Sequence, residues 1–280
     1  MLCLPSLRLL RTKFPGCVFS GLGKINHLRL AKEFSLCDKM LDCESARFTY
    51  FFENGLLSPE IEDFDSAILW IKDPEAAADS LSKRSCNVLS IDPFRETKSH
   101  PGLEYFRKIS DFFLPGSNPD IEDFFMDSEK NLPVDMGRVL IHPGSGSKNK
   151  NLPSYFYLKL GELLEKRGLR CDYLFGPVEI EKKEHLIYPE GKRVIPSDCV
   201  ELKKNIIASS LFIGNDSGPG HLAGFCGIKT ISIFLNSLPE RWRPLGKNVE
   251  VELIYDYKSL EEAIISIGKR AETLTSRNIS

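Results

Sequence analysis

Short apolar runs alternate with helix-length segments along the second half of the chain, and this alternation limits the fold more than any other feature. The runs have the length and character of buried strands, and they cover residues 138–142, 171–176, 211–215 and 229–235. Helical patterns lie between and after them, at 154–168, 179–187, 200–210, 219–226 and 259–274. Strands that alternate with helices pair in parallel through crossover connections. The pattern therefore predicts an open α/β domain.

The first half shows a similar but less regular alternation. Helices are predicted at 4–13, 25–34, 73–84 and 102–114, and strands at 17–23, 64–71 and 87–91. Asp73 is the expected N-cap of the third helix, with Pro74 at its first position. The stretch 115–137 is rich in proline, glycine and acids, which is typical of a linker. We expect two domains, 1–130 and 131–280, and the last helix could pack back on the first domain.

Composition narrows the class of partner and the compartment. The 280 residues carry a net charge of −2, without the strongly basic character of a nucleic-acid-binding domain, so no nucleic-acid partner is expected. The start of the chain does not resemble a signal peptide, and no apolar run approaches the roughly 20 residues of a membrane span. The eight cysteines include no CxxC pair and no metal-ligand spacing. We expect reduced thiols, no metal, and a cytoplasmic protein whose membrane contact, if any, is peripheral on the inner face.

The loop "HPGSGSKNKNLP" follows the predicted strand 138–142 directly. It combines glycines that let an anion approach the backbone with hydroxyls and positive charge, in Gly144, Gly146, Ser145, Ser147, Lys148 and Lys150. It matches neither a Walker loop nor GxGxxG nor GxSxG. Phosphate binding and a solvated turn with incidental lysines both remain open.

The stretch "GNDSGPGHLAG", residues 214–224, carries a strand directly into a helix. The first N–H groups of that helix and the positive end of its dipole form a site suited to a diphosphate. Asp216 or Ser217 can cap the helix, Gly218 and Gly220 leave room for a ligand, and His221 could donate to it. The alternative is a tight turn with an ordinary cap and a core histidine.

A third loop, "FLNSLPERWRPLG" at 234–246, follows the last predicted core strand. Arg241 and Arg243 flank Trp242, which could contact a base, a ribose or phosphates. A surface loop whose tryptophan packs between the domains is an equal alternative.

Taken in their order and spacing, the motifs "VLIHPGSGSKNKNLP", "LFGPVE", "LFIGNDSGPGHLAGFCGIKTISIF" and "RWRPLG" resemble glycosyltransferase family 9, the ADP-heptose:lipopolysaccharide heptosyltransferases. The likeness is strong over 138–250 and weaker at the start of the chain. It implies a GT-B architecture of two Rossmann-like domains facing across a cleft. It also implies inverting, metal-independent transfer of heptose or a related sugar. The donor would be a nucleotide-sugar such as ADP-heptose, the acceptor a glycolipid or oligosaccharide of lipopolysaccharide type, and no cofactor would be needed.

The resemblance assigns roles residue by residue. Lys150 matches the family's lysine before a Trp-Pro pair, although Leu152 stands in place of the tryptophan. Ser217, Gly218 and His221 match the family's D-[ST]-G-x-x-H turn, and Asp216 matches its acid, which would organise the loop. Ser145 and Ser147 would join this diphosphate site, and Gly220, Arg241 and Arg243 are candidate nucleotide contacts.

One departure affects catalysis. Family members begin with a strand and a Gly-Asp loop whose aspartate is the expected general base. This sequence starts at the helix that follows, so we expect an N-terminal domain that lacks its first strand. Three explanations compete: a start downstream of the true one, which we favour, a non-catalytic relative that binds a nucleotide or glycan, or another carboxylate such as Asp73 or Asp92. A sugar-nucleotide epimerase of the same architecture fits less well, because no matching acid set is evident. Arg8, Arg11 and Lys13 could meet an anionic acceptor, or form a solvated helix face.

Overall fold

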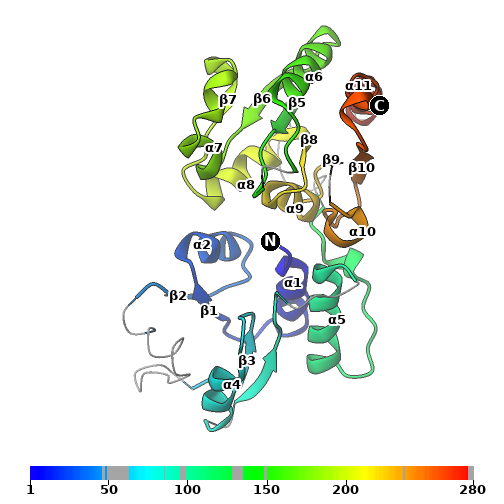
Figure 1. The fold of residues 1–280 in the computed structure, drawn as a ribbon. Helices are drawn as coiled ribbons and strands as arrows, with labels where there is room; N and C mark the ends of the chain where they lie inside the picture. Colours follow the sequence, from blue (N-terminus) through cyan, green and yellow to red (C-terminus); the bar gives the residue numbers. More distant parts are fainter. Residues whose placement is uncertain are drawn as a thin grey trace. The chain divides into compact units, whose positions relative to one another are not determined.

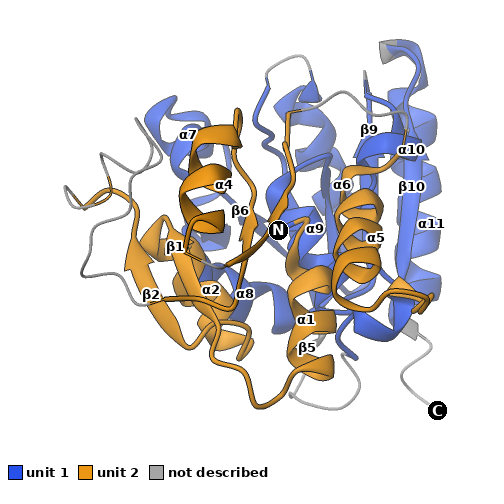
Figure 2. Ribbon diagram, turned by 90° about the horizontal axis from the view of Figure 1, so that it is seen from below, with its two compact units in different colours: residues 1, 122–280 blue, residues 2–121 orange. Residues whose placement is uncertain are grey.

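The computed structural model describes residues 1–45, 48, 63–84, 86–94, 99–127, 135–147, 150–235 and 237–276. The chain divides into two compact units, coloured separately in Figure 2. We call Leu2–Ile121 the N-terminal unit, and Glu122–Ser280 together with Met1 the C-terminal unit. The division falls within the predicted linker, where a short 3₁₀ helix, η2 (Ile121–Phe124), forms.

A parallel sheet forms the centre of the C-terminal unit (Figure 1). Its strands are β5 (Asp135–His142), β6 (Arg170–Leu174), β7 (Arg193–Val194), β8 (Ser209–Asn215), β9 (Thr230–Phe234) and β10 (Val249–Leu253). Across the sheet they follow the order β7-β6-β5-β8-β9-β10. This is the strand order of a Rossmann sheet, in which the chain direction across the sheet reverses between the two central strands, here β5 and β8.

Helices cover both faces of this sheet. They are α6 (Ser154–Lys166), α7 (Pro177–Glu181), α8 (Cys199–Ile207), α9 (Gly218–Phe225), α10 (Pro239–Trp242) and α11 (Leu260–Ser276), with 3₁₀ turns η5 (Glu184–Ile187), η6 (Glu190–Lys192) and η7 (Tyr257–Ser259). α6 and α11 pack on each other and share a core cluster with strand residues such as Val139 and Ile213, while α8 and α9 pack together against β8. The closing helix α11 thus packs on α6 and β8 of its own unit, whereas the sequence left open a return to the first domain.

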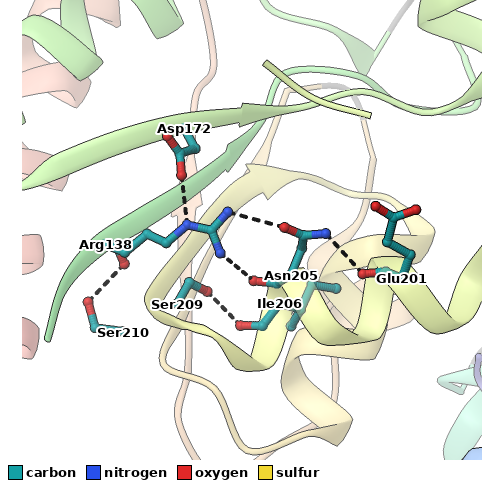
Figure 3. Close-up of polar contacts among 7 residues, drawn as sticks. All are labelled: Arg138, Asp172, Glu201, Asn205, Ile206, Ser209 and Ser210. Carbon is teal, nitrogen blue, oxygen red and sulfur yellow. Dashed lines mark hydrogen bonds and ion pairs between the residues drawn. The ribbon is translucent and has the colours of Figure 1, made fainter. Parts of the chain in front are cut away.

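The central strands form where they do because they are apolar along their whole length. Every residue of β8 and of β9 is buried, as expected for parallel strands covered on both faces. At the amino-terminal edge of the sheet, Arg138 ties three elements together (Figure 3). Its Nε donates to Asp172 Oδ2 of β6 at 2.7 Å, and its Nη1 donates to the carbonyl of Asn205 in α8 at 3.0 Å.

The described strands of the N-terminal unit are each four residues long. The helices and strands of this unit are α1 (Leu4–Lys13), β1 (Ser20–Gly23), α2 (Ile25–Glu33), β2 (Lys39–Asp42), β3 (Ser66–Leu69), α4 (Glu75–Ser82), β4 (Asn87–Ser90) and α5 (Pro101–Phe113). Within the described residues, β1 pairs with β2 and β3 with β4, as two separate parallel two-stranded sheets. The prediction that Asp73 caps α4 is wrong: Pro74 is the N-cap, and Asp73 lies in the left-handed region at φ 49°. Nowhere in the described ranges is a helix both long and apolar enough to cross a membrane.

Candidate functional site

Two loops from different parts of the chain lie at the switch point of the C-terminal sheet. β5 and β8 are neighbours, with His142 opposite Gly214 in the register. The residues that follow them, 143–153 (the lysine loop) and 216–217 (the β8–α9 turn), therefore begin at the same edge. In open parallel sheets, ligands bind in the crevice beyond the carboxyl ends of the strands at such a point.

The amino-terminal end of α9 has the features of an anion site. Ser217 occupies the N-cap position, but its side chain makes no cap hydrogen bond. Its hydroxyl is buried, and among the described residues it has no hydrogen-bond partner. A Cβ added to Gly218 would meet no described atom within 4 Å, so the backbone is open there. Together with the unpaired first N–H groups of the helix, these donors can hold a phosphate.

A lysine from the other loop reaches this helix end. Lys150 Nζ lies 2.7 Å from Asp216 Oδ2, and Asp216 immediately precedes the N-cap. The carboxylate is buried (6% exposed) and the lysine side chain is 32% exposed, so the ammonium stays accessible while it is held in place. The same ammonium lies 5.9 Å from the centre of the Trp242 ring.

α10 brings a second cation next to the same ring. The guanidinium carbon of Arg241 lies 5.2 Å from the centre of the Trp242 ring. Its Nε is buried and has no hydrogen-bond partner within the described part of the chain. Lys150 and Arg241 thus both lie beside one indole, close to the β8–α9 turn. Arg243 follows α10 and is exposed.

Several residues predicted to face a ligand face the protein instead. Ser145 is buried, and its hydroxyl lies 2.6 Å from Asn151 Oδ1 within the lysine loop. A Cβ on Gly144 would collide with the Glu179 carboxylate, so Glu179 explains this glycine. A Cβ on Gly220 would contact Pro244 at 3.4 Å. These three residues contact other parts of the protein, and the sequence alone does not reveal those contacts.

The remaining predicted residues stay at the site's margin. Ser147 and Gly146 are exposed on the lysine loop. His221 lies in the first turn of α9, where its N–H donates to the Ser217 carbonyl at 3.3 Å. Lys148 falls outside the described residues.

A buried amide network that the sequence did not reveal supports the two loops. Asn215, the last residue of β8, donates from Nδ2 to the carbonyl of Pro143 at 2.7 Å. Its Oδ1 accepts a hydrogen bond from the Tyr157 hydroxyl of α6. Burial raises the pKa of Tyr157 well above its usual value, so this hydroxyl stays protonated and is the donor. In the sequence, the network is indicated by the asparagines of two motifs, Asn151 in "KN" and Asn215 in "GND".

Two buried titratable residues lie beside the lysine loop. His142 ends β5, and its Nδ1 is 3.1 Å from the Leu174 carbonyl, to which it donates. Burial lowers the pKa of His142, and the Leu174 carbonyl and the Glu179 carboxylate oppose that shift. Glu179 accepts a hydrogen bond from the Gly176 N–H at 2.8 Å. The histidine is therefore neutral near pH 7, and its ring stabilises the end of β5 against β6.

The two substitute base candidates lie in the N-terminal unit. Asp73 and Asp92 follow β3 and β4, which pair in parallel with Leu69 opposite Ser90, so both belong to the same sheet edge. Asp73 is 81% exposed. Asp92 Oδ1 accepts from the Phe94 N–H at 2.8 Å in a local turn. Asp73 thus lies largely in solvent, and Asp92 is engaged in its own turn. In the part of the chain that the structure describes, no group of three or more His, Cys, Asp or Glu residues could hold a metal ion.

Fold and site together define the class of protein: an α/β protein with a Rossmann unit whose switch point is suited to a nucleotide's phosphates. Comparison with known proteins makes the class narrower. The model of glycosyltransferase family 9 (heptosyltransferase) matches residues 103–263, more than half of the chain. A putative glycosyltransferase from Haemophilus influenzae is 29% identical over 136 residues, which are 44% of this chain but only 38% of that relative's length.

Solved structures agree with the family match. The family 9 glycosyltransferase of Veillonella parvula aligns with a TM-score of 0.71 and 16% identity, covering 98% of this chain and 93% of that one. E. coli heptosyltransferase WaaC, solved with ADP, also aligns with a TM-score of 0.71 and 16% identity, covering 98% of this chain and 95% of that one. The chain has the GT-B-type fold of these proteins. It belongs to glycosyltransferase family 9, the heptosyltransferase family.

Proposed function

We propose that the protein is an inverting, metal-independent glycosyltransferase that transfers heptose or a related sugar from a nucleotide-sugar donor to a lipopolysaccharide-type acceptor. The observation that carries this proposal is the Lys150 ammonium, held by Asp216 at the amino-terminal end of α9 in a family 9 fold. An ADP-sugar is the proposed donor, supported by the ADP in the similar WaaC structure. The glycolipid or oligosaccharide acceptor follows from the family alone.

The chemistry requires stabilisation of the leaving group. When the acceptor hydroxyl attacks the anomeric carbon, its proton passes to a carboxylate base or to water. The bond from that carbon to the diphosphate breaks, and the diphosphate takes the electron pair. Donors already aimed at this developing charge lower the barrier. Here the donors are the first N–H groups of α9, the Ser217 hydroxyl and Lys150, with Arg241 close by. These groups make a metal unnecessary in our proposal.

A binding protein without turnover is the second candidate. The observation in its favour is the setting of the two substitute bases, since Asp73 is solvent-exposed and Asp92 is engaged in its own turn. Such a homologue would bind a nucleotide or a glycan through the same C-terminal site. It would bind ADP normally and release no sugar to any acceptor.

We also propose that the protein acts in the cytoplasm, peripherally on the inner face of the membrane, because its acceptor would be a glycolipid. The basic face of α1 supports this less than the sequence suggested. Arg11 Nη2 lies 2.7 Å from Asp38 Oδ2, and Nη1 donates to the Cys17 carbonyl at 3.0 Å. Arg11 is thus engaged within its own unit and Nη1 of Arg8 is buried, which leaves the exposed Lys13 for such a contact.

Calorimetry with ADP tests the site, and a transfer assay tests the activity. The Lys150→Ala variant should bind ADP with about tenfold to hundredfold lower affinity, the value of one charge-assisted hydrogen bond of roughly 1.5–3 kcal/mol. The matched control is Lys159→Ala, which removes an exposed lysine paired with Glu261 in the same unit and should bind as the wild type does. ADP affinity unchanged by Lys150→Ala would refute the assignment.

The transfer assay measures ADP released from ADP-heptose, with and without a lipopolysaccharide core acceptor. Release that depends on the acceptor, and that falls in the Lys150→Ala variant, supports the enzyme. ADP binding without any acceptor-dependent release supports the binding protein.

A further inference from the structure

Two neighbouring residues of the lysine loop contact two neighbouring residues at the end of β8. Lys150 pairs with Asp216 at 2.7 Å, and the next residue, Asn151, accepts from Asn215 Nδ2 at 3.4 Å. The ion pair is partly exposed, whereas Asn215 is 1% exposed. The buried Asn215 amide therefore holds the loop from the protein interior, while the Lys150 ammonium remains accessible to solvent.

The orientation of the Asn215 side chain is determined on both sides. Its Oδ1 accepts from the Tyr157 hydroxyl, so its Nδ2 must face the lysine loop, where it donates to the Pro143 carbonyl at 2.7 Å. Pro143 begins the lysine loop and Asn151 lies near its end. One amide thus contacts the loop near both ends, and the Ser145 hydroxyl adds a hydrogen bond within the loop, to Asn151 Oδ1 at 2.6 Å.

We infer that Asn215 is a positioning residue of the donor site, which acts by holding the lysine loop so that Lys150 lies at the amino-terminal end of α9. The inference rests on the proposed function, since it concerns the binding of a donor diphosphate there. In this inference Asn215 does not contact a phosphate itself, because its amide is already hydrogen-bonded to Tyr157, Pro143 and Asn151. The Tyr157 hydroxyl is a second positioning group, because its hydrogen bond to Oδ1 fixes the orientation of the Asn215 amide.

The physical consequence is a loss of preorganisation. The Asn215→Leu variant keeps a similar volume but releases the Pro143 carbonyl and the loop behind it. The free-energy cost of ordering the loop and the long Lys150 side chain then opposes ADP binding. We expect ADP affinity to fall roughly tenfold. That loss should vanish when the lysine is already absent, because the loop then has no ammonium to position.

A double-mutant cycle on the full chain tests this coupling, with ADP as the probe and calorimetry as the measurement. The variants are Asn215→Leu, Lys150→Ala and the combination of the two. Asn215→Leu is expected to weaken ADP binding roughly tenfold alone, and by less than about twofold in the Lys150→Ala background. A full tenfold loss in both backgrounds would overturn the inference, because it would show a general effect on folding.

A milder pair of variants keeps the test valid if Asn215→Leu does not fold. Tyr157→Phe removes the hydroxyl that orients the Asn215 amide and is expected to weaken ADP binding severalfold. Tyr173→Phe is the matched control: it removes a buried hydroxyl from the same core, which donates to the backbone carbonyl of Tyr157 at 3.4 Å and not to the Asn215 amide. It should leave ADP affinity unchanged. Equal losses in the two variants would contradict the inference.

The two proposals fail separately in this experiment. If Lys150→Ala binds ADP as the wild type does, the proposed function fails. If Lys150→Ala weakens binding while Asn215→Leu and Tyr157→Phe do not, the site stands and the positioning role is wrong.

Discussion

Replacement of Arg138 by methionine should destabilise the C-terminal unit strongly, even though the residue lies at the opposite edge of the sheet from the site. The side chain is 9% exposed, and its partner Asp172 is 18% exposed. The change keeps most of the packing volume but leaves the Asp172 carboxylate without its cation and the Asn205 carbonyl without its donor. Removal of one partner of a buried pair costs about 3–5 kcal/mol. Because Asp172 retains some contact with water, we expect the lower value, about 3 kcal/mol.

The assay is urea denaturation followed by the fluorescence of Trp242. The chain has two tryptophans, one in each unit, so a Trp70→Phe background makes the signal specific to the C-terminal unit. Arg167→Met is the matched control, since Arg167 pairs with Glu272, which is 51% exposed. An exposed pair of this kind contributes only about 0–1 kcal/mol.

A second variant separates the charge effect from packing. The combination Arg138→Met with Asp172→Leu removes both charges and should recover most of the lost stability, because an apolar pair can replace a buried ion pair. A loss for Arg138→Met no larger than that for Arg167→Met would refute the reasoning. So would a double variant as unstable as the single one.

Three further changes have expected outcomes. Gly218→Val should reduce ADP affinity by more than about tenfold without loss of folding, because the added side chain would enter the open space at the end of α9. His142→Asn should flatten the pH dependence of the unfolding free energy below about pH 6.5. The lowered pKa of His142 gives stability that is present above the unfolded value and lost as the pH falls through the folded one. A thiol reagent should modify exposed Cys17 first, since burial raises the pKa of Cys171 and of Cys226 to about 12.

Each of these has a control. Gly191→Val adds a side chain at another open glycine, in η6, and should leave ADP binding unchanged. For His142, urea midpoints of wild type and variant are compared between pH 5 and pH 8, and parallel curves would contradict the neutral buried ring. For the thiols, mass spectrometry of the labelled native protein identifies the modified site. Labelling of Cys171 as fast as that of Cys17 would show that the core cluster opens readily.

The sequence predicts the core of the C-terminal unit well, because fully buried parallel strands appear as continuous apolar runs. β8 and β9 are of this kind, and the structure confirms both. β10 was missed because its sequence "VEVEL" alternates with charged residues at the edge of the sheet. β7 and α10 are too short to produce a period, with two and four residues. β2 begins with the exposed Lys39, and its apolar residues are only half-buried.

The candidate site is predicted in part. Pro219 marks the start of α9, and Gly218 leaves the backbone open there. The lysine loop lies beside this helix end because β5 and β8 are neighbours in the sheet. The hydrogen bond of the Ser145 hydroxyl to Asn151 could not be predicted, because the folding of the loop brings the two side chains together. The Asn215 network was missed because Tyr157 lies 58 positions away and looks like a core aromatic residue. Side-chain partners of this kind depend on packing, which a periodic pattern does not encode.

A crystal structure of the protein with ADP bound tests the central claim most directly. The account predicts diphosphate oxygens within hydrogen-bond distance of the Gly218 N–H, the Ser217 hydroxyl and Lys150 Nζ, with Lys150 shared between the nucleotide and Asp216. A nucleotide bound away from the amino-terminal end of α9, or a Lys150 side chain turned away from its phosphates, would contradict it.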